Sequence, residues 1–269
     1  MRIEDSAMIH PSDSADDVPV PALQAVGIGK RFGRFTALES IDLSVQAGTL
    51  HAIIGPNGAG KTTLFNVLTG QLAPSRGTVL VHGESVNRVP VHRRLGVGLA
   101  RCFQVTSLFP ELTVLENVRL AVQGRHSKHA FDCWSPVGRS RGPIDQAQQV
   151  LERVGLQRVA QRKTSELSHG QQRLLEVAMS LAPEPKILLL DEPTSGMGID
   201  DVPVMERLLS QLTGEYTIVM IEHNMAMTMR VANRIAVLVA GKVLIDGEPD
   251  EIRADEGVQR AYLGEGLSA

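Results

Sequence analysis

Residues Gly55 to Thr62 read Gly-Pro-Asn-Gly-Ala-Gly-Lys-Thr and constrain the fold more than any other part of the chain. This is the pattern G-x-x-x-x-G-K-T, a loop whose backbone amides surround phosphate oxygens. Residues 49–54 before it predict a buried strand, and residues 61–70 predict a helix whose N-terminus adds partial positive charge. The sequence therefore predicts a nucleoside triphosphate site at a strand–loop–helix junction.

Two side chains of this loop have specific expected roles. Lys61 should reach the β- and γ-phosphates, and the hydroxyl of Thr62 should hold Mg²⁺. The predicted nucleotide-contacting residues here are Gly55, Pro56, Asn57, Gly58, Ala59, Gly60, Lys61, Thr62 and Thr63.

Composition restricts the surroundings of this site. The formal net charge of −3 over 269 residues gives no electrostatic support for nucleic-acid binding. Two cysteines, Cys102 and Cys133, are too few for a disulfide framework and suit a reducing compartment. No apolar run approaches the roughly 20 residues that span a bilayer, and the polar start has no signal-peptide pattern. We therefore expect a cytosolic chain that reaches a membrane only through partners.

The pattern along the chain is that of an α/β domain with a helical insertion. Residues 1–21 are expected to be a disordered leader, and 22–269 the folded domain. Helical patterns dominate about 105–182, and Gly124 to Pro143 resembles a surface insertion. The expected strands are 23–28, 41–46, 49–54, 78–82, 186–191, 217–222, 234–239 and 242–246, with Lys30 to Gly33 separating the first two. The expected helices are 61–70, 113–122, 144–154 and 171–182.

Two acids close an apolar strand at Ile187 to Glu192. In phosphate-loop enzymes the acid at such a strand end holds the Mg²⁺ shell, so Asp191 is the predicted metal residue. Glu192 is then placed to polarise a water for attack on the γ-phosphate. Acids at strand ends often only reach solvent, but the phosphate loop upstream favours the functional interpretation.

The segment Leu167-Ser168-His169-Gly170-Gln171 resembles the signature motif of ABC ATPases, LSGGQ, with His169 in place of its first glycine. Ser168 alone would also be an ordinary N-cap of a helix. The resemblance implies that this helix N-terminus binds the γ-phosphate of ATP held by a second ATPase subunit. The ATP-binding residues that it implies are Ser168, His169, Gly170 and Gln171.

Other motifs of the family can be located one at a time. Gln104 matches the Q-loop glutamine that senses Mg²⁺ and the attacking water, and His223 matches the switch histidine that contacts the γ-phosphate. Phe32 matches the aromatic residue that stacks on adenine, with Phe35 as a second choice. The resemblance implies ATP and Mg²⁺ as cofactors and a phosphate-loop ABC ATPase core with an antiparallel β subdomain and an inserted helical subdomain. It implies catalytic roles for Glu192, His223 and Gln104, and metal binding by Thr62, Gln104 and Asp191.

One loop departs from the family pattern. Gly198 stands where many ABC ATPases have aspartate, although Asp200 lies close by in the sequence. The aspartate that the family pattern places in this loop, at the contact between the paired ATPases, is therefore replaced by glycine in this chain.

The branch of the family is indicated by residues 101–118, by the insertion around Gly124 to Pro143, by Ile221 to Met225 and by Gln259 to Glu265. They resemble ATPases of branched-chain and hydrophobic amino acid importers. The implied partners are two transmembrane permease subunits, a second ABC ATPase of the same or another kind and, indirectly, an extracellular or periplasmic substrate-binding protein. The implied location is the cytoplasmic face of the membrane. Urea or amide importers and lipopolysaccharide exporters are the alternatives, followed by soluble ABC ATPases and a nucleotide-binding subunit without turnover.

Overall fold

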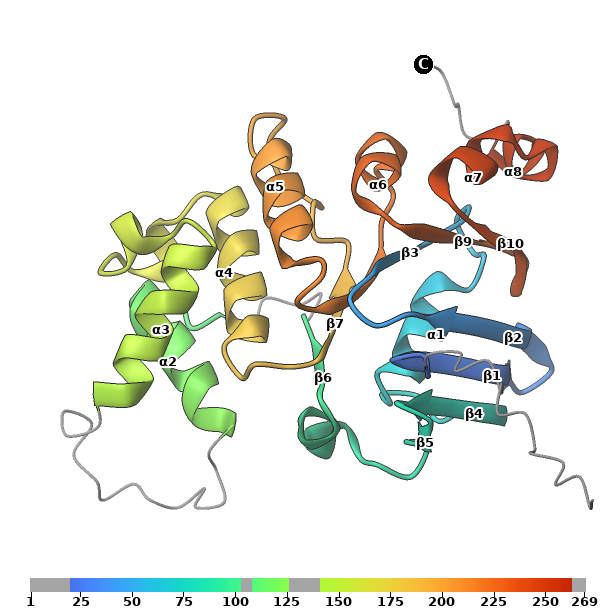
Figure 1. Cartoon of the computed structure of the whole chain (residues 1–269), viewed down its shortest axis with the longest axis horizontal. Coiled ribbons are helices and arrows are strands. Elements are labelled where there is room, and N and C mark those ends of the chain that lie inside the picture. The colour runs from blue at the N-terminus through green and yellow to red at the C-terminus, as the bar shows by residue number, and fades with distance from the viewer. Residues whose placement is uncertain (1–19, 103–107, 126–140, 263–269) are drawn as a thin grey trace, which may run out of the picture.

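The computed structural model describes residues 20–102, 108–125 and 141–262, which contain two sheets (Figure 1). The smaller sheet is antiparallel and has the strand order β2-β1-β4-β5. The larger has the order β10-β9-β3-β8-β7-β6 and is parallel except for β10. The strands are β1 (Leu23–Phe32), β2 (Phe35–Val45), β3 (Leu50–Ile54), β4 (Arg76–Val81), β5 (Glu84–Ser85), β6 (Leu99–Arg101), β7 (Ile187–Asp191), β8 (Thr217–Ile221), β9 (Arg234–Val239) and β10 (Lys242–Gly247).

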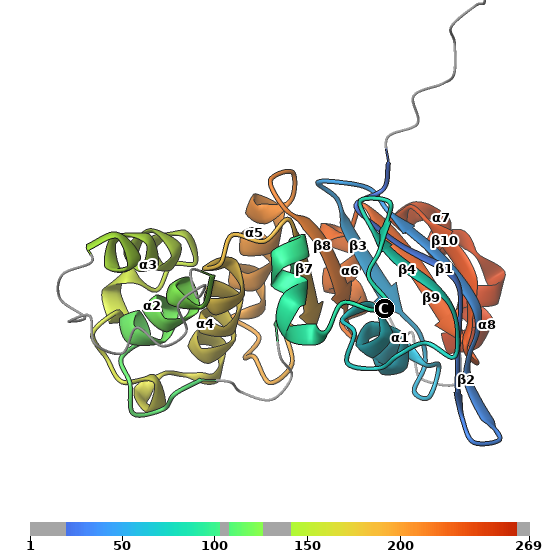
Figure 2. The ribbon, with the colours of Figure 1, turned by 90° about the horizontal axis from the view of Figure 1, so that it is seen from below.

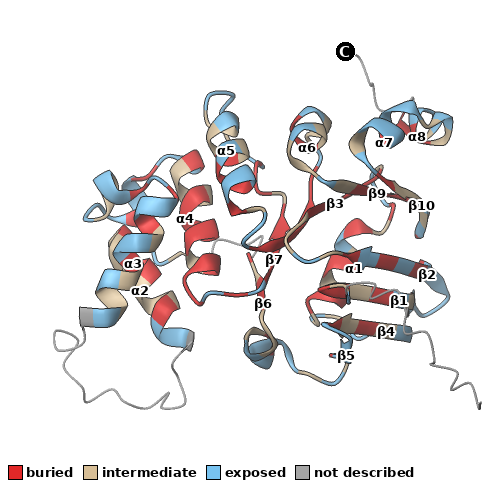
Figure 3. Cartoon of the chain, viewed as in Figure 1, coloured by how far each residue is buried: buried red, intermediate tan, exposed pale blue. Residues whose placement is uncertain are grey.

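The central strands of the larger sheet are buried on both faces, which explains why most of their residues are apolar. In β3, Leu50, Ala52 and Ile54 face one core, whereas Ile53 faces the other. The two cores are separate because side chains alternate across a strand. Figure 3 shows these buried strands in the middle of the molecule.

The helices are distributed over the two cores. Helix α1 (Lys61–Leu68) lies between the two sheets, with Leu64, Phe65 and Leu68 in the second core. Helices α2 (Val114–Arg125), α3 (Arg141–Arg153) and α4 (His169–Leu181) pack together beyond β6 and β7 (Figures 1 and 2). The others are α5 (Val202–Leu212), α6 (Met225–Val231), α7 (Pro249–Ala254), α8 (Glu256–Tyr262) and the 3-10 turns η1 (Val91–Val97), η3 (Gln157–Val159) and η4 (Thr164–Glu166).

The predicted α/β class with an antiparallel sheet and inserted helices is confirmed. The extent of the helical part, about 105–182, stays a prediction that the pairing of β6 with β7 supports, since the chain leaves and re-enters the sheet at neighbouring strands. The predicted leader 1–21 falls outside the described residues except for Val20 and Pro21. Within those described ranges, no helix combines the length and apolarity needed to cross a bilayer.

Several boundaries were predicted wrongly. Lys30 to Gly33 does not separate the first two strands, because β1 continues to Phe32 and the hairpin turns at Gly33 and Arg34. The ends of the predicted insertion 124–143 belong to α2 and α3, and its middle is outside the described residues. Sequence reasoning also missed β6 and helices α5 to α8. Helix α5 had a visible signal, because its buried residues Met205, Leu208, Leu209 and Leu212 have helical spacing.

Candidate functional site

The phosphate loop joins the C-terminal end of β3 to α1, with β3 between β9 and β8 in the sheet. Two of its glycines are required by close packing. A Cβ on Gly55 would lie 2.1 Å from the carbonyl oxygen of Leu238, and one on Gly60 would lie 2.8 Å from that of Ala37. Gly60 also has a φ of 102°, which side-chain-bearing residues rarely adopt. The loop therefore keeps its shape only with glycine at these positions.

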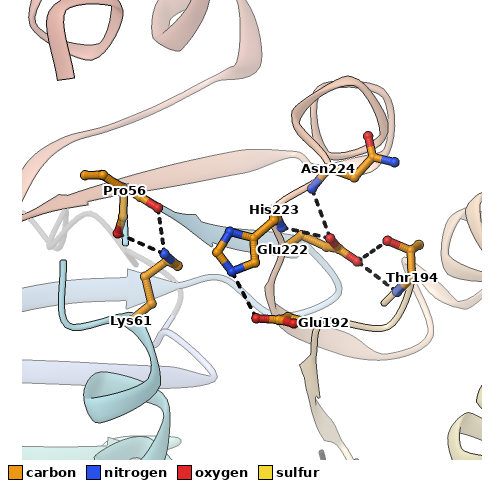
Figure 4. Close-up of polar contacts among 8 residues, drawn as sticks. Pro56, Lys61, Glu192, Thr194, Glu222, His223 and Asn224 are labelled. Carbon is orange, nitrogen blue, oxygen red and sulfur yellow. Dashed lines mark hydrogen bonds and ion pairs between the residues drawn. The ribbon is translucent and has the colours of Figure 1, made fainter. Parts of the chain in front are cut away.

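Positive charge gathers in the loop. The Lys61 ammonium is buried and donates to the carbonyl oxygens of Gly55 at 2.6 Å and Pro56 at 3.1 Å (Figure 4). The N-cap of α1 is Gly60, and no side chain caps this helix. Its first-turn amides and the ammonium thus concentrate positive potential at one point, an arrangement that suits a polyphosphate.

Asp191 ends β7 as predicted and is almost fully buried. Its Oδ2 accepts from the Arg101 guanidinium at 3.2 Å, and Arg101 also donates to the Asn66 side chain of α1 at 2.8 Å. Burial raises the pKa of Asp191, Arg101 opposes this rise, and the neighbouring Glu192 adds to it. Sequence reasoning did not identify Arg101, which joins β6, β7 and α1 around the acid.

The oxygen donors present fit a magnesium ion. Thr62 lies four residues before Asn66 and so on the same side of α1, one turn nearer the phosphate loop. Asp191 is held toward that side of α1 through Arg101. A hydroxyl and a carboxylate are hard ligands, and Mg²⁺ takes few protein ligands because it keeps water and substrate phosphate oxygens. No cluster of three or more His, Cys, Asp or Glu suited to a metal occurs in the described parts of the chain.

Glu192 and His223 are brought together, as Figure 4 shows. The His223 Nε2 lies 3.0 Å from Glu192 Oε1, and the side chains are half-exposed and partly exposed. Glu192 has a φ of 49°, and its amide donates to the carbonyl oxygen of Ile221 in β8. A positive φ in a non-glycine residue is a strain that functional sites tolerate because it directs a side chain.

The residue between β8 and His223 was not identified as a site residue. Glu222 is 3% exposed, and its carboxylate accepts bonds from Thr194, His223 and Asn224 (Figure 4). The sequence did carry a signal, because Glu222 closes a buried apolar strand as Asp191 does in the neighbouring strand.

The signature segment forms the start of α4, away from α1 in both views (Figures 1 and 2). Ser168 is the N-cap: its Oγ accepts from the Gln171 amide and its own amide donates to the Gln171 side chain, both at 3.2 Å. His169 is exposed, whereas Gly170 is buried against Asp201, whose Oδ2 would lie 2.3 Å from an added Cβ. A larger residue at position 170 would therefore require the Asp201 side chain to move.

The loop after Glu192 lies against this helix. Arg173 of α4 donates from Nε to the carbonyl oxygen of Ser195 at 3.1 Å. Asp201 is the acid next to both Gly170 and Gly198, whereas the sequence had suggested Asp200 near Gly198. Ile199, directly after Gly198 in the chain, is 91% exposed. The loop thus presents an apolar side chain to the outside while its neighbours contact α4.

The remaining predicted residues are the two phenylalanines of the β1–β2 hairpin and Gln104. Phe32 and Phe35 face each other at the exposed end of the β1–β2 hairpin, and Lys30 Nζ lies 5.2 Å from the Phe32 ring centroid. The hairpin is near the phosphate loop, because Ala37 of β2 touches Gly60. Gln104 lies outside the described residues. The structure thus brings together the loop residues 55–63, Asp191, Glu192 and His223, and keeps residues 168–171 apart from them.

Comparison with known proteins gives concordant matches. A family model described as ABC transporter matches residues 38–195, and one described as branched-chain amino acid ATP-binding cassette transporter matches residues 242–267. The chain is 38% identical over 252 residues to the high-affinity branched-chain amino acid transport ATP-binding protein BraF of Pseudomonas aeruginosa, covering 91% of this chain and 98% of that protein. It is 37% identical over 251 residues to LivG of Escherichia coli, a protein of the same description, with coverage of 91% and 98%.

A solved structure has the same fold. The crystal structure of the ADP conformation of MJ1267, an ATP-binding cassette of an ABC transporter, superposes with a TM-score of 0.81 at 29% identity. The match covers 91% of this chain and 99% of that one. The architecture and the sequence matches therefore agree.

Proposed function

Because the chain belongs to the family of ABC transporter ATP-binding proteins, we propose that it binds and hydrolyses ATP to energise a membrane importer of branched-chain or other hydrophobic amino acids. The observation that carries the substrate class is the match of residues 242–267 to the branched-chain amino acid model, since the ATPase core is common to the whole family. The names of BraF and LivG support the same class.

ATP would be held mainly by the phosphate loop. Its amides and Lys61 would bind the phosphates, while Thr62 and Asp191 would hold Mg²⁺, which neutralises charge on the phosphates when bound. Glu192 would accept a proton from the attacking water, and His223 would contact the γ-phosphate. Phe32 would stack on adenine, and Gln104 keeps its predicted role near the metal. Positioning and electrostatics supply most of the rate in phosphoryl transfer.

Two ATPase subunits would form a head-to-tail pair around two ATP molecules. Ser168, His169 and Gly170 belong to the start of α4, a helix that lies apart from α1 (Figure 2), and we propose that they complete the site of the other subunit. The exposed Ile199 would be covered in the same pair. The second subunit is either another copy or a related ATPase, and we favour a related one.

A cavity of about 540 Å³ offers a docking place for a permease. It lies between η1, β6 and α4, and the exposed Val91 is part of its wall. Its further apolar lining comes from Leu95, Leu99, Cys102, Leu108 and Met179. A cytoplasmic permease loop seated there would place the chain on the inner face of the membrane and transmit closure of the ATPase pair.

Copurification tests the importer proposal. The chain, purified from detergent-solubilised membranes under reversible crosslinking, is expected to bring two multispan permeases and a second ABC ATPase. Binding of the complex to an extracellular substrate-binding protein should respond to leucine, isoleucine or valine. Recovery of export permeases, or a binding protein that answers only to urea or amides, would replace the proposed substrate class.

The role of Ser168 across the pair predicts a charge-dependent effect. Ser168→Asp keeps an N-cap residue, so the free energy of unfolding should change by less than about 1 kcal/mol. It also puts a negative charge where the γ-phosphate of the other subunit would lie, so kcat for ATP should fall by about 10²-fold. Ser168→Thr, which keeps the cap without the charge, is the control and should retain most activity. Equal kcat values for the two variants would show that Ser168 does not lie near the γ-phosphate of the other subunit.

A further inference from the structure

The Glu222 carboxylate is the centre of a buried hydrogen-bond cluster (Figure 4). Its Oε1 accepts from the amide of Thr194 at 2.8 Å and from the hydroxyl of the same residue at 2.5 Å. Its Oε2 accepts from the amides of His223 at 2.8 Å and Asn224 at 3.1 Å. One side chain thus joins the loop after β7 to the loop after β8.

The donors around Glu222 suit a side chain that ends in two acceptor oxygens. Three of the four are backbone N–H groups, which can only donate, and a carboxylate is the one side chain with two acceptor oxygens and no donor hydrogen. A glutamine in this place would direct its NH₂ group at one or two of those amides and leave them buried without an acceptor. The surroundings of position 222 therefore favour glutamate over glutamine.

The two loops that Glu222 joins hold the two groups proposed to act on the γ-phosphate. Thr194 follows Glu192 by two residues, and His223 contacts Glu192 directly at 3.0 Å. The Glu192 amide is bonded to Ile221, directly before Glu222. The relative position of the Glu192 and His223 side chains is thus set from both sides by one buried acid.

The same loop continues toward the signature helix. The Met197 amide donates to the Thr194 carbonyl oxygen at 3.1 Å, and Arg173 of α4 donates to the next carbonyl, that of Ser195, at 3.1 Å. Ser195 and Thr194 therefore connect α4 to Glu222 through hydrogen bonds and the chain itself. The cluster lies on the covalent and hydrogen-bonded route between α4 and His223.

We propose that Glu222 is a positioning residue for ATP hydrolysis, which holds Glu192 and His223 in register and couples them to the loop that contacts α4. The inference rests on the proposed ATPase function. Glu222 is almost fully buried and would not touch ATP itself. Its effect is on kcat, because a misplacement of about 1 Å in reacting groups costs roughly 10²-fold in rate.

The test compares Glu222→Gln with a matched amide variant in the same part of the fold. For Glu222→Gln, kcat should fall by about 10-fold or more while KM for ATP changes by less than about 3-fold, since the phosphate loop is intact. Glu206→Gln is the control, because this acid pairs with Arg230 between α5 and α6 and is outside the site. It should leave kcat within about 2-fold of wild type.

A milder pair of variants keeps the test decisive if Glu222→Gln folds poorly. Thr194→Val removes only the hydroxyl donor and keeps the amide, so it should lower kcat by about 3-fold, and Thr194→Ser should restore the wild-type value. Unchanged kcat in folded Glu222→Gln, or a loss of kcat that Glu206→Gln shares, would overturn the proposal.

Hydrogen exchange separates this inference from the ATPase function. The amides of Thr194, His223 and Asn224 should exchange at least about 10-fold faster in Glu222→Gln than in wild type, whereas those of the Glu206→Gln chain should not. A wild-type chain that does not hydrolyse ATP, alone or with its partners, would contradict the proposed function. The exchange rates would then still test whether Glu222 holds together the loops that carry Glu192 and His223. Unchanged rates in Glu222→Gln would overturn that inference.

Discussion

Replacing Lys61 with alanine is expected to raise the Kd for ATP by about 100-fold or more, which corresponds to about 2.7 kcal/mol. The ammonium is buried in the phosphate loop, where it already bonds to the carbonyls of Gly55 and Pro56. A desolvated charge in this position interacts with phosphate far more strongly than a surface lysine does. Titration with a fluorescent ATP analogue in the presence of Mg²⁺ measures the change.

Lys186→Ala is the matched control for the lost charge. Lys186 is exposed and directly precedes β7, at the end of that strand opposite to Asp191. Its removal changes the net charge equally but should leave the Kd within about 2-fold of wild type, because exposed charges beyond a Debye length are screened. If Lys61→Ala binds ATP as the control does, the loop from Gly55 to Thr62 is not the phosphate site.

Glu192→Gln is expected to lower kcat by about 10²-fold or more while leaving the Kd for ATP nearly unchanged. The amide keeps the size of the side chain and can remain beside His223, but it cannot accept a proton from water. With hydrolysis blocked and the second ATPase present, an ATP-bound pair of subunits should accumulate, and light scattering after size exclusion should detect the summed mass of the two subunits.

Two comparisons make this second result specific. Asp145→Asn removes an exposed acid on α3 and should hydrolyse ATP at the wild-type rate without forming a trapped pair. The Thr194 amide should exchange at the wild-type rate in Glu192→Gln but faster in Glu222→Gln, because only Glu192→Gln keeps the buried hydrogen bonds of Thr194. Rapid turnover by a monomeric Glu192→Gln chain would exclude Glu192 as the proton acceptor.

The parts of the fold that sequence reasoning found are those with a strong local pattern. Strands β3, β7 and β8 each consist of five buried residues, of which four are apolar, and the phosphate loop gives the position of α1. Strand β6 was missed because three residues, Leu99–Arg101, carry no recognisable alternation and become a strand only by pairing with β7. A local sequence pattern predicts a strand or helix more reliably when the element is longer.

The candidate site was predictable to a similar extent. Asp191 ends β7, Glu192 follows it, and His223 lies two residues after β8, and motifs place all three relative to the phosphate loop. The departure at Gly198 was recognised, but the neighbouring acid proved to be Asp201, because a loop that folds back on α4 has no periodicity from which side-chain direction can be derived.

The sequence by itself determined the family, the phosphate loop and the acids that end β7, because each depends on consecutive residues whose chemistry and spacing are local. Only the tertiary structure decided that Arg101 pairs with Asp191, 90 residues away, and that Glu222 bonds to Thr194, 28 residues away. Such contacts form where separate strands end at one edge of the sheet. The physical reason is that a buried charge must find its partners in three dimensions, whatever their distance along the chain.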